Sequence, residues 1–246
     1  MNTSYNENDL IEYFKPFDSF TSADISLFFR KIEPEIKQST INWRTHRLVQ
    51  KSVIYSLGKG IFTLKPIIEF KPIADKTIIS LSRIISKTFP FINFVIWNSS
   101  ILNTISQHIS NKNIILIEVE KDSIESVFLL LKEKKKEVYI NPSTEIINNY
   151  IYDSNKTVYV IKNLISESPL LRVDNYTMPS IEKILVDVYS NPSLFQSYQG
   201  RELRHLFTNA FEKYSISVQK MIRYATRRGK KEELLLFIQQ IIGNKN

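Results

Sequence analysis

Along the first fifty residues, apolar side chains recur at intervals of three and four, the spacing that gathers them on one face of a helix. They predict two short helices and, after a proline, a third, with these core positions: Leu10, Ile11, Phe14, Ile25, Phe28, Phe29, Ile41 and Leu48. Trp43 is expected at the edge of the same core. Thr21 or Ser22 would cap the second helix, because a hydroxyl accepts a hydrogen bond from a free amide of the first turn. Ser39 or Thr40 would cap the third in the same way.

Two short β runs follow the third helix, at Val53–Leu57 and Ile61–Leu64, and the sequence Gly-Lys-Gly at 58–60 joins them. Glycine adopts positive φ without steric cost, so this arrangement predicts a tight hairpin. Three helices and then a hairpin is the order of a winged helix-turn-helix domain. Two prolines mark the exit from this unit. We therefore expect a winged-helix DNA-binding domain over residues 1–72 and a second domain over residues 73–246.

After residue 72, helical patterns alternate with runs of strand type. Strands are expected at Phe91–Trp97, Ile114–Val119, Glu137–Ile140 and Thr157–Ile161, with helices between them at about 75–88, 98–109, from 122 and from 142. Such alternation predicts an α/β layer with a largely parallel sheet. The Ile114–Val119 run does not alternate with polar residues, which is typical of a strand buried on both faces. From Pro179 onward the pattern is helical, so the expected fold is mixed α/β with a C-terminal helical bundle.

Composition supports a folded chain, since 43% of the residues are hydrophobic and 24% are charged. The absence of cysteine excludes disulfides, thiolate metal sites and a cysteine nucleophile. Neither a signal peptide nor an apolar stretch of roughly 18 residues, the length of a membrane span, is visible. We expect a cytoplasmic protein that does not contact a membrane.

Positive charge is concentrated in two segments of a chain whose net charge is +8. Residues 37–71 hold seven basic residues and one acidic residue, and residues 199–231 hold nine basic and two acidic residues. The rest of the chain is therefore net acidic. Basic segments on an acidic body are typical of nucleic-acid binding, in which basic side chains displace the counterions of the phosphates.

The third predicted helix and the hairpin carry the candidate DNA-binding residues: Ser39, Thr40, Asn42, Arg44, Arg47, Lys51 and, at the hairpin tip, Lys59. At about 100° per residue, Thr40, Arg44 and Arg47 would share one face of the helix. Hydroxyls and cations at a helix start can contact phosphates, whereas Asn and Arg can read adenine and guanine edges. The alternative interpretation is an ordinary helix with a solvated polar face.

The second basic segment offers a further anion-binding face, formed by Arg201, Arg204, Arg223, Arg227, Arg228 and Lys231. Positions 223 and 227 are one helical turn apart, with 228 and 231 near them. One interpretation is a surface for the DNA backbone. The alternative is that these arginines pair with acidic residues of the α/β layer.

Glu118 and Glu120, at the end of a buried strand, suggest a metal-dependent nuclease as a less favoured hypothesis. The usual Glu-x-Lys spacing is shifted, however, and the preceding strand supplies no aspartate. Phosphate-binding loops, dinucleotide-binding glycine motifs and a nucleophile elbow are all missing from the sequence. We assign no catalytic residue, metal ligand or cofactor.

The segment Phe20–Leu64, ending in Ser-Leu-Gly-Lys-Gly-Ile-Phe-Thr-Leu, is similar to the N-terminal winged helix of the AbiEi-like antitoxins, transcriptional regulators of type IV toxin–antitoxin (abortive-infection) systems. The stretches Ile114–Pro142 and Pro179–Asp187 resemble an uncharacterised bacterial family often linked to those antitoxins. The resemblance implies that the winged helix binds repeats upstream of its operon and that the partner toxin is a nucleotidyltransferase. It would place these residues on the DNA: Thr40, Asn42, Arg44, Arg47 and Lys59.

We therefore expect a non-enzymatic, sequence-specific transcriptional regulator that binds a double-stranded operator, as the antitoxin or repressor of a toxin–antitoxin or phage-defence operon. The alternative is a protein-interaction module that neutralises a toxin, and the metal-dependent nuclease is the third hypothesis. A homodimer would read two half-sites together, but no coiled-coil heptad determines the oligomeric state.

Overall fold

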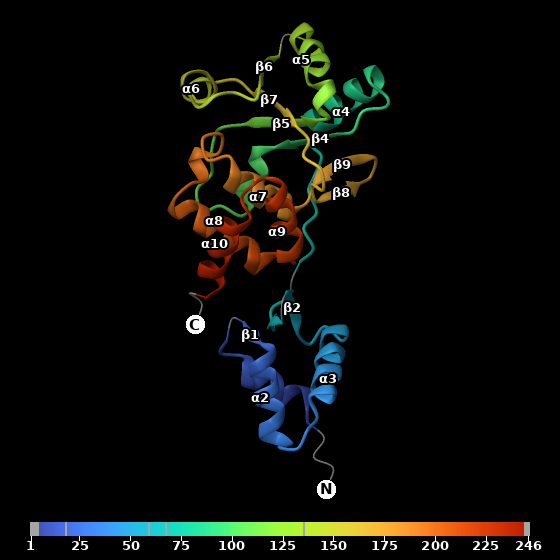
Figure 1. Ribbon diagram of the computed structural model, residues 1–246, viewed down its shortest axis with the longest axis vertical. Coiled ribbons are helices and arrows are strands. Elements are labelled where there is room, and N and C mark those ends of the chain that lie inside the picture. The colour runs from blue at the N-terminus through green and yellow to red at the C-terminus, as the bar shows by residue number, and fades with distance from the viewer. Residues whose placement is uncertain (1–4, 18, 59, 67, 135, 244–246) are drawn as a thin grey trace. The chain divides into compact units, whose positions relative to one another are not determined.

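The computed structural model describes residues 5–17, 19–58, 60–66, 68–134 and 136–243 (Figure 1). The fold is mixed α/β with a helical C-terminal region, as predicted. Two compact units divide the chain: a first unit of residues 1–69, 211–218 and 242–246, and a second unit of residues 70–210 and 219–241. The division at Glu69 lies close to the predicted boundary at residue 72, but the two predicted domains were contiguous and did not anticipate the return of residues 211–218.

Three helices and a three-stranded antiparallel sheet form most of the first unit. Its elements are α1 (Glu7–Phe14), β1 (Phe20–Thr21), α2 (Ser22–Ile32), α3 (Gln38–Gln50), β2 (Tyr55–Gly58) and β3 (Ile61–Thr63). The sheet order is β1-β3-β2, so the predicted hairpin is present and gains a short third strand. Thr21 caps α2 as predicted: its hydroxyl accepts from the Asp24 amide at 3.2 Å, and the Asp24 carboxylate accepts from the Thr21 amide at 2.7 Å.

The core of the first unit is rich in phenylalanine. Its buried residues are Leu10, Phe14, Phe20, Ile25, Phe28, Phe29, Ile41, Leu48, Ile54 and Phe62. Phe14 of α1 stacks on Phe20 of β1 with ring centroids 3.9 Å apart, which ties the first helix to the sheet. Ile68 exchanges backbone hydrogen bonds with Lys213 and Ser215, at 3.2 Å each, and so holds the returning segment to this unit.

A four-stranded mixed sheet with order β4-β5-β7-β6 is the centre of the second unit (Figure 1). Its strands and the two helices on one face are α4 (Lys76–Thr88), β4 (Phe94–Asn98), β5 (Ile114–Val119), α5 (Ile124–Glu133), β6 (Glu137–Ile140) and β7 (Val158–Asn163). The β5–β7 and β6–β7 pairs are parallel, and β4 is antiparallel to β5. All six residues of β5 are buried, as its continuous apolar run predicted.

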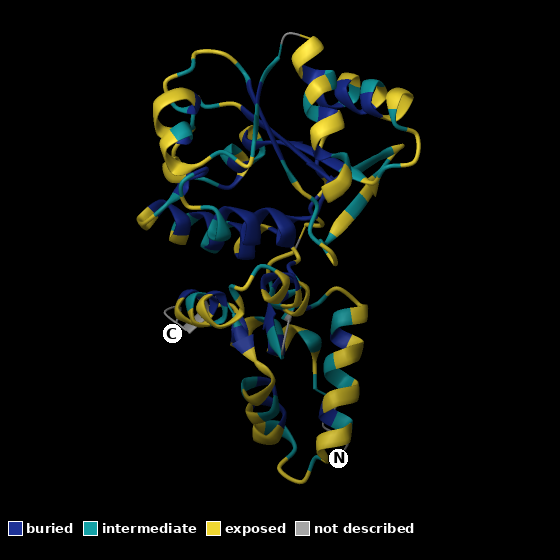
Figure 2. Cartoon of the chain, turned by 45° about the horizontal axis from the view of Figure 1, so that its top comes forward, coloured by how far each residue is buried: buried dark blue, intermediate teal, exposed yellow. Residues whose placement is uncertain are grey.

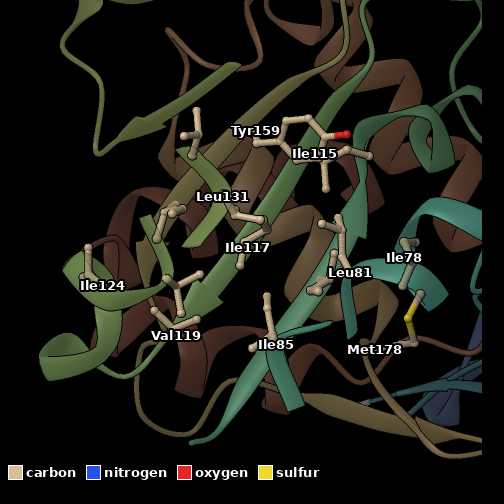
Figure 3. Close-up of a cluster of buried hydrophobic side chains, with 14 residues drawn as sticks. Ile78, Leu81, Ile85, Ile115, Ile117, Val119, Ile124, Leu131, Tyr159 and Met178 are labelled. Atoms are coloured by element: carbon tan, nitrogen blue, oxygen red, sulfur yellow. The ribbon is translucent and has the colours of Figure 1, made fainter. Parts of the chain in front are cut away.

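Alternation along β5 assigns its side chains to two different surroundings. Ile115, Ile117 and Val119 join the apolar cluster formed with α4 and α5 (Figure 3). Glu118 has the opposite parity, so its carboxylate points to the other face of the sheet. A buried acid therefore lies on the face away from this cluster.

The remaining elements follow β7 or connect the strands. They are η1 (Ser99–Thr104), η2 (Lys121–Ser123), α6 (Thr144–Ile146), η3 (Ile147–Ile151), β8 (Leu170–Val173), β9 (Tyr176–Pro179), α7 (Ile181–Ser190), η4 (Gln196–Tyr198), α8 (Arg201–Lys213), α9 (Val218–Arg227) and α10 (Lys231–Gly243). The helix predicted over 98–109 is only the short 3₁₀ helix η1, and the β8–β9 hairpin was not predicted. Residues 181–188 of α7 are all buried (Figure 2). Within the described parts of the chain, no helix has the length and apolar character of a membrane span.

Candidate functional site

Helix α3 presents six exposed residues on one face, at relative positions 0, 3, 4, 7, 8 and 11: Ser39, Asn42, Trp43, His46, Arg47 and Gln50. We call this set the α3 exposed face. The spacing places the six side chains within less than half of the helix circumference. No Asp or Glu occurs anywhere in α3. The face therefore combines a hydroxyl, two amides, an indole, an imidazole and a guanidinium without any carboxylate of its own helix.

Two buried side chains fix the orientation of this face. Ile41 and Leu48 are seven residues apart, two helical turns, and are at most 1% exposed. They anchor the opposite side of α3 in the phenylalanine-rich core. The helix starts at Gln38 with Lys37 as its N-cap and without a side-chain cap. The prediction of Ser39 or Thr40 as the cap was therefore wrong, and Ser39 lies exposed in the first turn.

Arg44 was predicted to contact DNA beside Arg47, but in the structure its guanidinium has partners within the first unit. Its guanidinium forms two hydrogen bonds to the Glu33 carboxylate, at 2.9 and 3.2 Å, and the Arg44 side chain is only 17% exposed. The same guanidinium lies 5.0 Å from the Tyr5 ring centroid and 5.3 Å from that of Phe29. Arg44 therefore stabilises the contact of α3 with the rest of the first unit and does not offer a free cation.

Arg47 is exposed, as predicted, whereas Trp43 is more exposed than predicted. Trp43 was expected at the core, but it is 58% exposed. The Arg47 guanidinium lies 5.1 Å from the Trp43 ring centroid, a cation–π arrangement that orients the guanidinium on the helix surface. No carboxylate among the described residues pairs with Arg47. This arginine is exposed, oriented and unneutralised.

The other predicted residues of this region have mixed outcomes. Thr40 is half-buried, and the Asn42 side-chain oxygen accepts from the Gln38 amide at 3.1 Å. Lys51 forms an exposed ion pair with Glu7, and exposed pairs contribute little free energy and exchange readily. Lys59 lies outside the described residues.

Several members of the second basic face pair with acidic side chains, and two of its arginines share one carboxylate. Arg223 and Arg227 pair with Glu167, and Arg228 pairs with Asp187 at 3.2 Å. The alternative interpretation, in which these arginines pair with acids of the α/β layer, agrees with the Glu167 pairs of Arg223 and Arg227, whereas the partner of Arg228 lies in the helical region, on α7. The remaining predicted members are held as follows: Lys231 pairs with Glu232 at 3.3 Å, Arg204 donates to Gln240 at 3.2 Å, and Arg201 is exposed.

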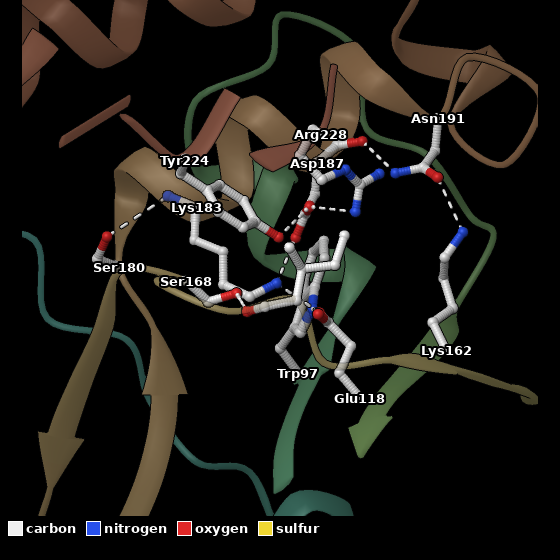
Figure 4. A network of polar contacts seen from close by, with 11 residues as sticks. Trp97, Glu118, Lys162, Ser168, Ser180, Lys183, Asp187, Asn191, Tyr224 and Arg228 are labelled. Carbon is white, nitrogen blue, oxygen red and sulfur yellow. Dashed lines mark hydrogen bonds and ion pairs between the residues drawn. The ribbon is translucent and has the colours of Figure 1, made fainter. Parts of the chain in front are cut away.

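A buried network of charged residues lies between α7, α9 and the sheet (Figure 4). Its centre is Lys183, which is completely buried and whose ammonium lies 2.5 Å from both the Glu118 and the Asp187 carboxylates. The Tyr224 hydroxyl donates to Asp187 at 2.9 Å, and the Trp97 indole donates to Glu118 at 3.1 Å. Every charge in this centre therefore has a partner.

At the centre of the network, the two carboxylates Glu118 and Asp187 face the two cations Lys183 and Arg228. Burial lowers the pKa of Lys183, but Asp187 and Glu118 raise it by more, so the ammonium remains protonated. Burial raises the pKa of Glu118 above its ordinary value, although Lys183 opposes this shift. Burial and the neighbouring Asp187 carboxylate raise the pKa of Tyr224, which keeps the hydroxyl as a donor. The network joins α7 and α9 to β5 by neutralised, hydrogen-bonded charges.

Residues 40–244 match the model of a family described as "Family of unknown function (DUF6577)". The chain belongs to this family. The DUF6577 match begins inside α3 and continues into α10, so it includes most of the α3 exposed face and the whole buried network. No curated protein matches the chain at a significant level.

In this DUF6577 chain, the carboxylates of the nuclease hypothesis have separate partners. Glu118 accepts from Lys183 and Trp97 inside the network, and Glu120 accepts from the Asn93 amide at 2.5 Å. Among the residues described, no three His, Cys, Asp or Glu side chains gather as a metal site would require. The geometry therefore gives this hypothesis no support. The sequence had signalled the network by Glu118 in the apolar run of β5 and by a Lys and an Asp four residues apart within the apolar run of α7.

Proposed function

We propose that this protein binds double-stranded DNA through its first unit, with α3 in the major groove, and thereby regulates transcription. The element order α1-β1-α2-α3-β2-β3 supports the proposal, because winged-helix domains have this order and use the third helix for recognition. The resemblance to the AbiEi-like antitoxins points to the same class. The observation that carries the proposal is the α3 exposed face, which has donors and acceptors for base edges and lacks carboxylates.

Each group on this face has a suitable partner in DNA. The Asn42 and Gln50 amides can form the paired hydrogen bonds that adenine offers in the major groove, and the Arg47 guanidinium those of guanine. Ser39, in the first turn, is placed for a phosphate oxygen near the helix N-terminus. Trp43 supplies apolar area and orients Arg47. Lys51 can exchange its exposed partner Glu7 for a phosphate.

The turn between β2 and β3 serves as the proposed wing. Gly60 has a φ of 76°, and its carbonyl accepts hydrogen bonds from the Ser22 amide at 2.7 Å and the Ser22 hydroxyl at 3.2 Å. These bonds tie the turn to the start of α2. Lys59, the predicted phosphate contact of the wing, directly precedes this anchored glycine in the sequence.

The proposed setting is a toxin–antitoxin or phage-defence operon, in which the protein represses its own promoter. This part of the proposal depends on the resemblance, which also implies a nucleotidyltransferase toxin as the partner. An operator with two half-sites would be read by a homodimer.

Fluorescence anisotropy tests DNA binding, using a labelled duplex from the region upstream of the protein's own gene and a shuffled duplex of equal composition. We expect tighter binding to the upstream duplex, and a loss of about tenfold or more in affinity for Asn42→Ala and for Arg47→Ala. Lys15→Ala is the matched control, because Lys15 is an exposed cation outside α3; its affinity should change less than about threefold. Equal binding of both duplexes, or unchanged affinity of both α3 variants, would refute the proposal.

A further inference from the structure

The second unit contains a pocket of about 570 Å³ that the proposed function does not use. One wall is α4, another is the start of β4, and a third is the β8–β9 hairpin. β9 packs beside β4, so the hairpin is held against the sheet and not left free. The volume is in the range of pockets that enclose small organic ligands.

The pocket brings together two arginines from elements far apart in the sequence. Arg83 of α4 and Arg172 of β8 both line it, and both are exposed. Neither pairs with a carboxylate among the residues that the structure describes, and no lining residue is acidic. By contrast, the arginines of α9 in the same unit pair with Glu167. A concave site with two unneutralised guanidiniums favours an anionic ligand.

Neutral donors around the arginines identify the type of anion. The hydroxyls of Ser82, Ser86 and Thr177 and the amide of Asn175 line the same pocket. A single guanidinium satisfies a carboxylate with two parallel hydrogen bonds, whereas a phosphate monoester presents three free oxygens and uses more donors. Two guanidiniums and several neutral donors therefore match a phosphate better than a carboxylate.

The side of the pocket formed by β4 and β9 also carries an apolar, partly aromatic wall. Phe94 of β4, Tyr176 of β9 and Leu164 after β7 line it. A free inorganic phosphate would leave this wall and most of the volume unused. A flat organic body attached to the phosphate would cover the aromatic side chains, as nucleobases do on aromatic protein surfaces.

We propose that this pocket binds a small phosphorylated aromatic compound of the mononucleotide class. Arg83 and Arg172 hold the phosphate, the hydroxyl side chains complete its hydrogen bonds, and Phe94 and Tyr176 contact the planar body. The site lies wholly within the second unit and does not require that α3 binds DNA.

Isothermal titration calorimetry of the full chain with adenosine 5′-monophosphate tests the proposal. We expect one-to-one binding, with adenosine and inorganic phosphate each at least about tenfold weaker, since each lacks one half of the ligand. Arg83→Gln and Arg172→Gln should each weaken binding of the nucleotide by about tenfold or more while the melting temperature is unchanged. Arg201→Gln is the matched control, an exposed arginine of the same unit outside the pocket, and should bind as the wild type does.

Several outcomes would overturn the assignment. Absence of binding, or wild-type affinity in both pocket variants, removes the site. An equal loss in Arg201→Gln would show general attraction to a basic surface. A second pocket of about 430 Å³ is lined by three lysines, so a loss in Lys136→Gln with none in Arg83→Gln would place the ligand there instead. If a short DNA duplex competed for the pocket as strongly as the nucleotide does, the result would assign Arg83 and Arg172 to the binding of DNA phosphates.

Discussion

Replacing Lys183 by methionine tests whether the buried network stabilises the second unit through paired charges. The substitution keeps a long apolar side chain but removes the ammonium that faces Glu118 and Asp187. Asp187 retains Tyr224 and Arg228, whereas Glu118 retains only the Trp97 indole among the partners in Figure 4. The variant therefore leaves one buried carboxylate without a counter-charge.

Removing one partner of a buried ion pair costs about 3–5 kcal/mol, so we expect a loss of this size in the free energy of unfolding at neutral pH. The loss should shrink as the pH falls. Burial already raises the pKa of Glu118, and without Lys183 the pKa rises further. The folded variant then binds a proton that the unfolded chain releases, so its stability is higher at low pH and decreases as the pH rises through the folded-state pKa.

Urea unfolding at pH 5 and pH 8 measures both effects, followed by circular dichroism and by the fluorescence of Trp97, one of two tryptophans and buried beside Glu118. The double variant Lys183→Met with Glu118→Gln should recover a large part of the loss, because the amide carries no charge and still accepts from Trp97. Lys15→Met breaks an exposed pair and should cost less than about 1 kcal/mol. A loss below about 1 kcal/mol for Lys183→Met, or an equal loss at both pH values, would refute the assigned role.

Two further predictions concern the first unit, and thermal unfolding checks both. Arg44→Ala should destabilise the first unit by about 2 kcal/mol, because the substitution breaks a pair held by two hydrogen bonds and leaves the half-buried Glu33 carboxylate without a counter-charge. Arg47→Ala should change the stability of this unit by less than about 0.5 kcal/mol. Equal effects of the two substitutions would contradict the roles assigned to these arginines. Gly60→Ala should cost at least about 1 kcal/mol, because φ is 76° and the new Cβ would lie 2.6 Å from the Ser22 hydroxyl oxygen. Wild-type stability of Gly60→Ala would show that the turn is not anchored as described.

Local patterns predicted much of the fold. The helices of the first unit, the hairpin after them and the four strands of the mixed sheet followed from apolar spacing and from glycine placement. The elements that were missed depend on long-range contacts. The two residues of β1 form a strand only because β3 lies beside them. In residues 98–109, the regular apolar spacing is too short to support a stable α-helix, and only the 3₁₀ helix η1 forms. The β8–β9 hairpin had a local signal in Asp174-Asn175, where Asp174 has a φ of 51°.

The site was predicted less well, for a physical reason. Helical spacing alone placed Arg44 and Arg47 on one face, but the sequence does not state which arginine meets a carboxylate. Arg44 reaches Glu33 across the space between α2 and α3, and Trp43 remains outside the core because Ile41 and Leu48 fill it. The Glu118–Lys183 contact joins residues 65 positions apart, a separation that periodicity cannot detect.

The central claim is that the α3 exposed face reads bases, and a scan of operator base pairs tests it most directly. The affinities of wild-type protein and of Arg47→Ala would be measured for the upstream duplex with each base pair replaced in turn. We predict that replacing one particular G·C pair costs the wild-type protein about 1–3 kcal/mol of binding free energy. The same replacement should leave the affinity of Arg47→Ala unchanged, while this variant still discriminates at the other base pairs. A uniform loss of affinity at every position, or an unchanged profile in the variant, would contradict the claim.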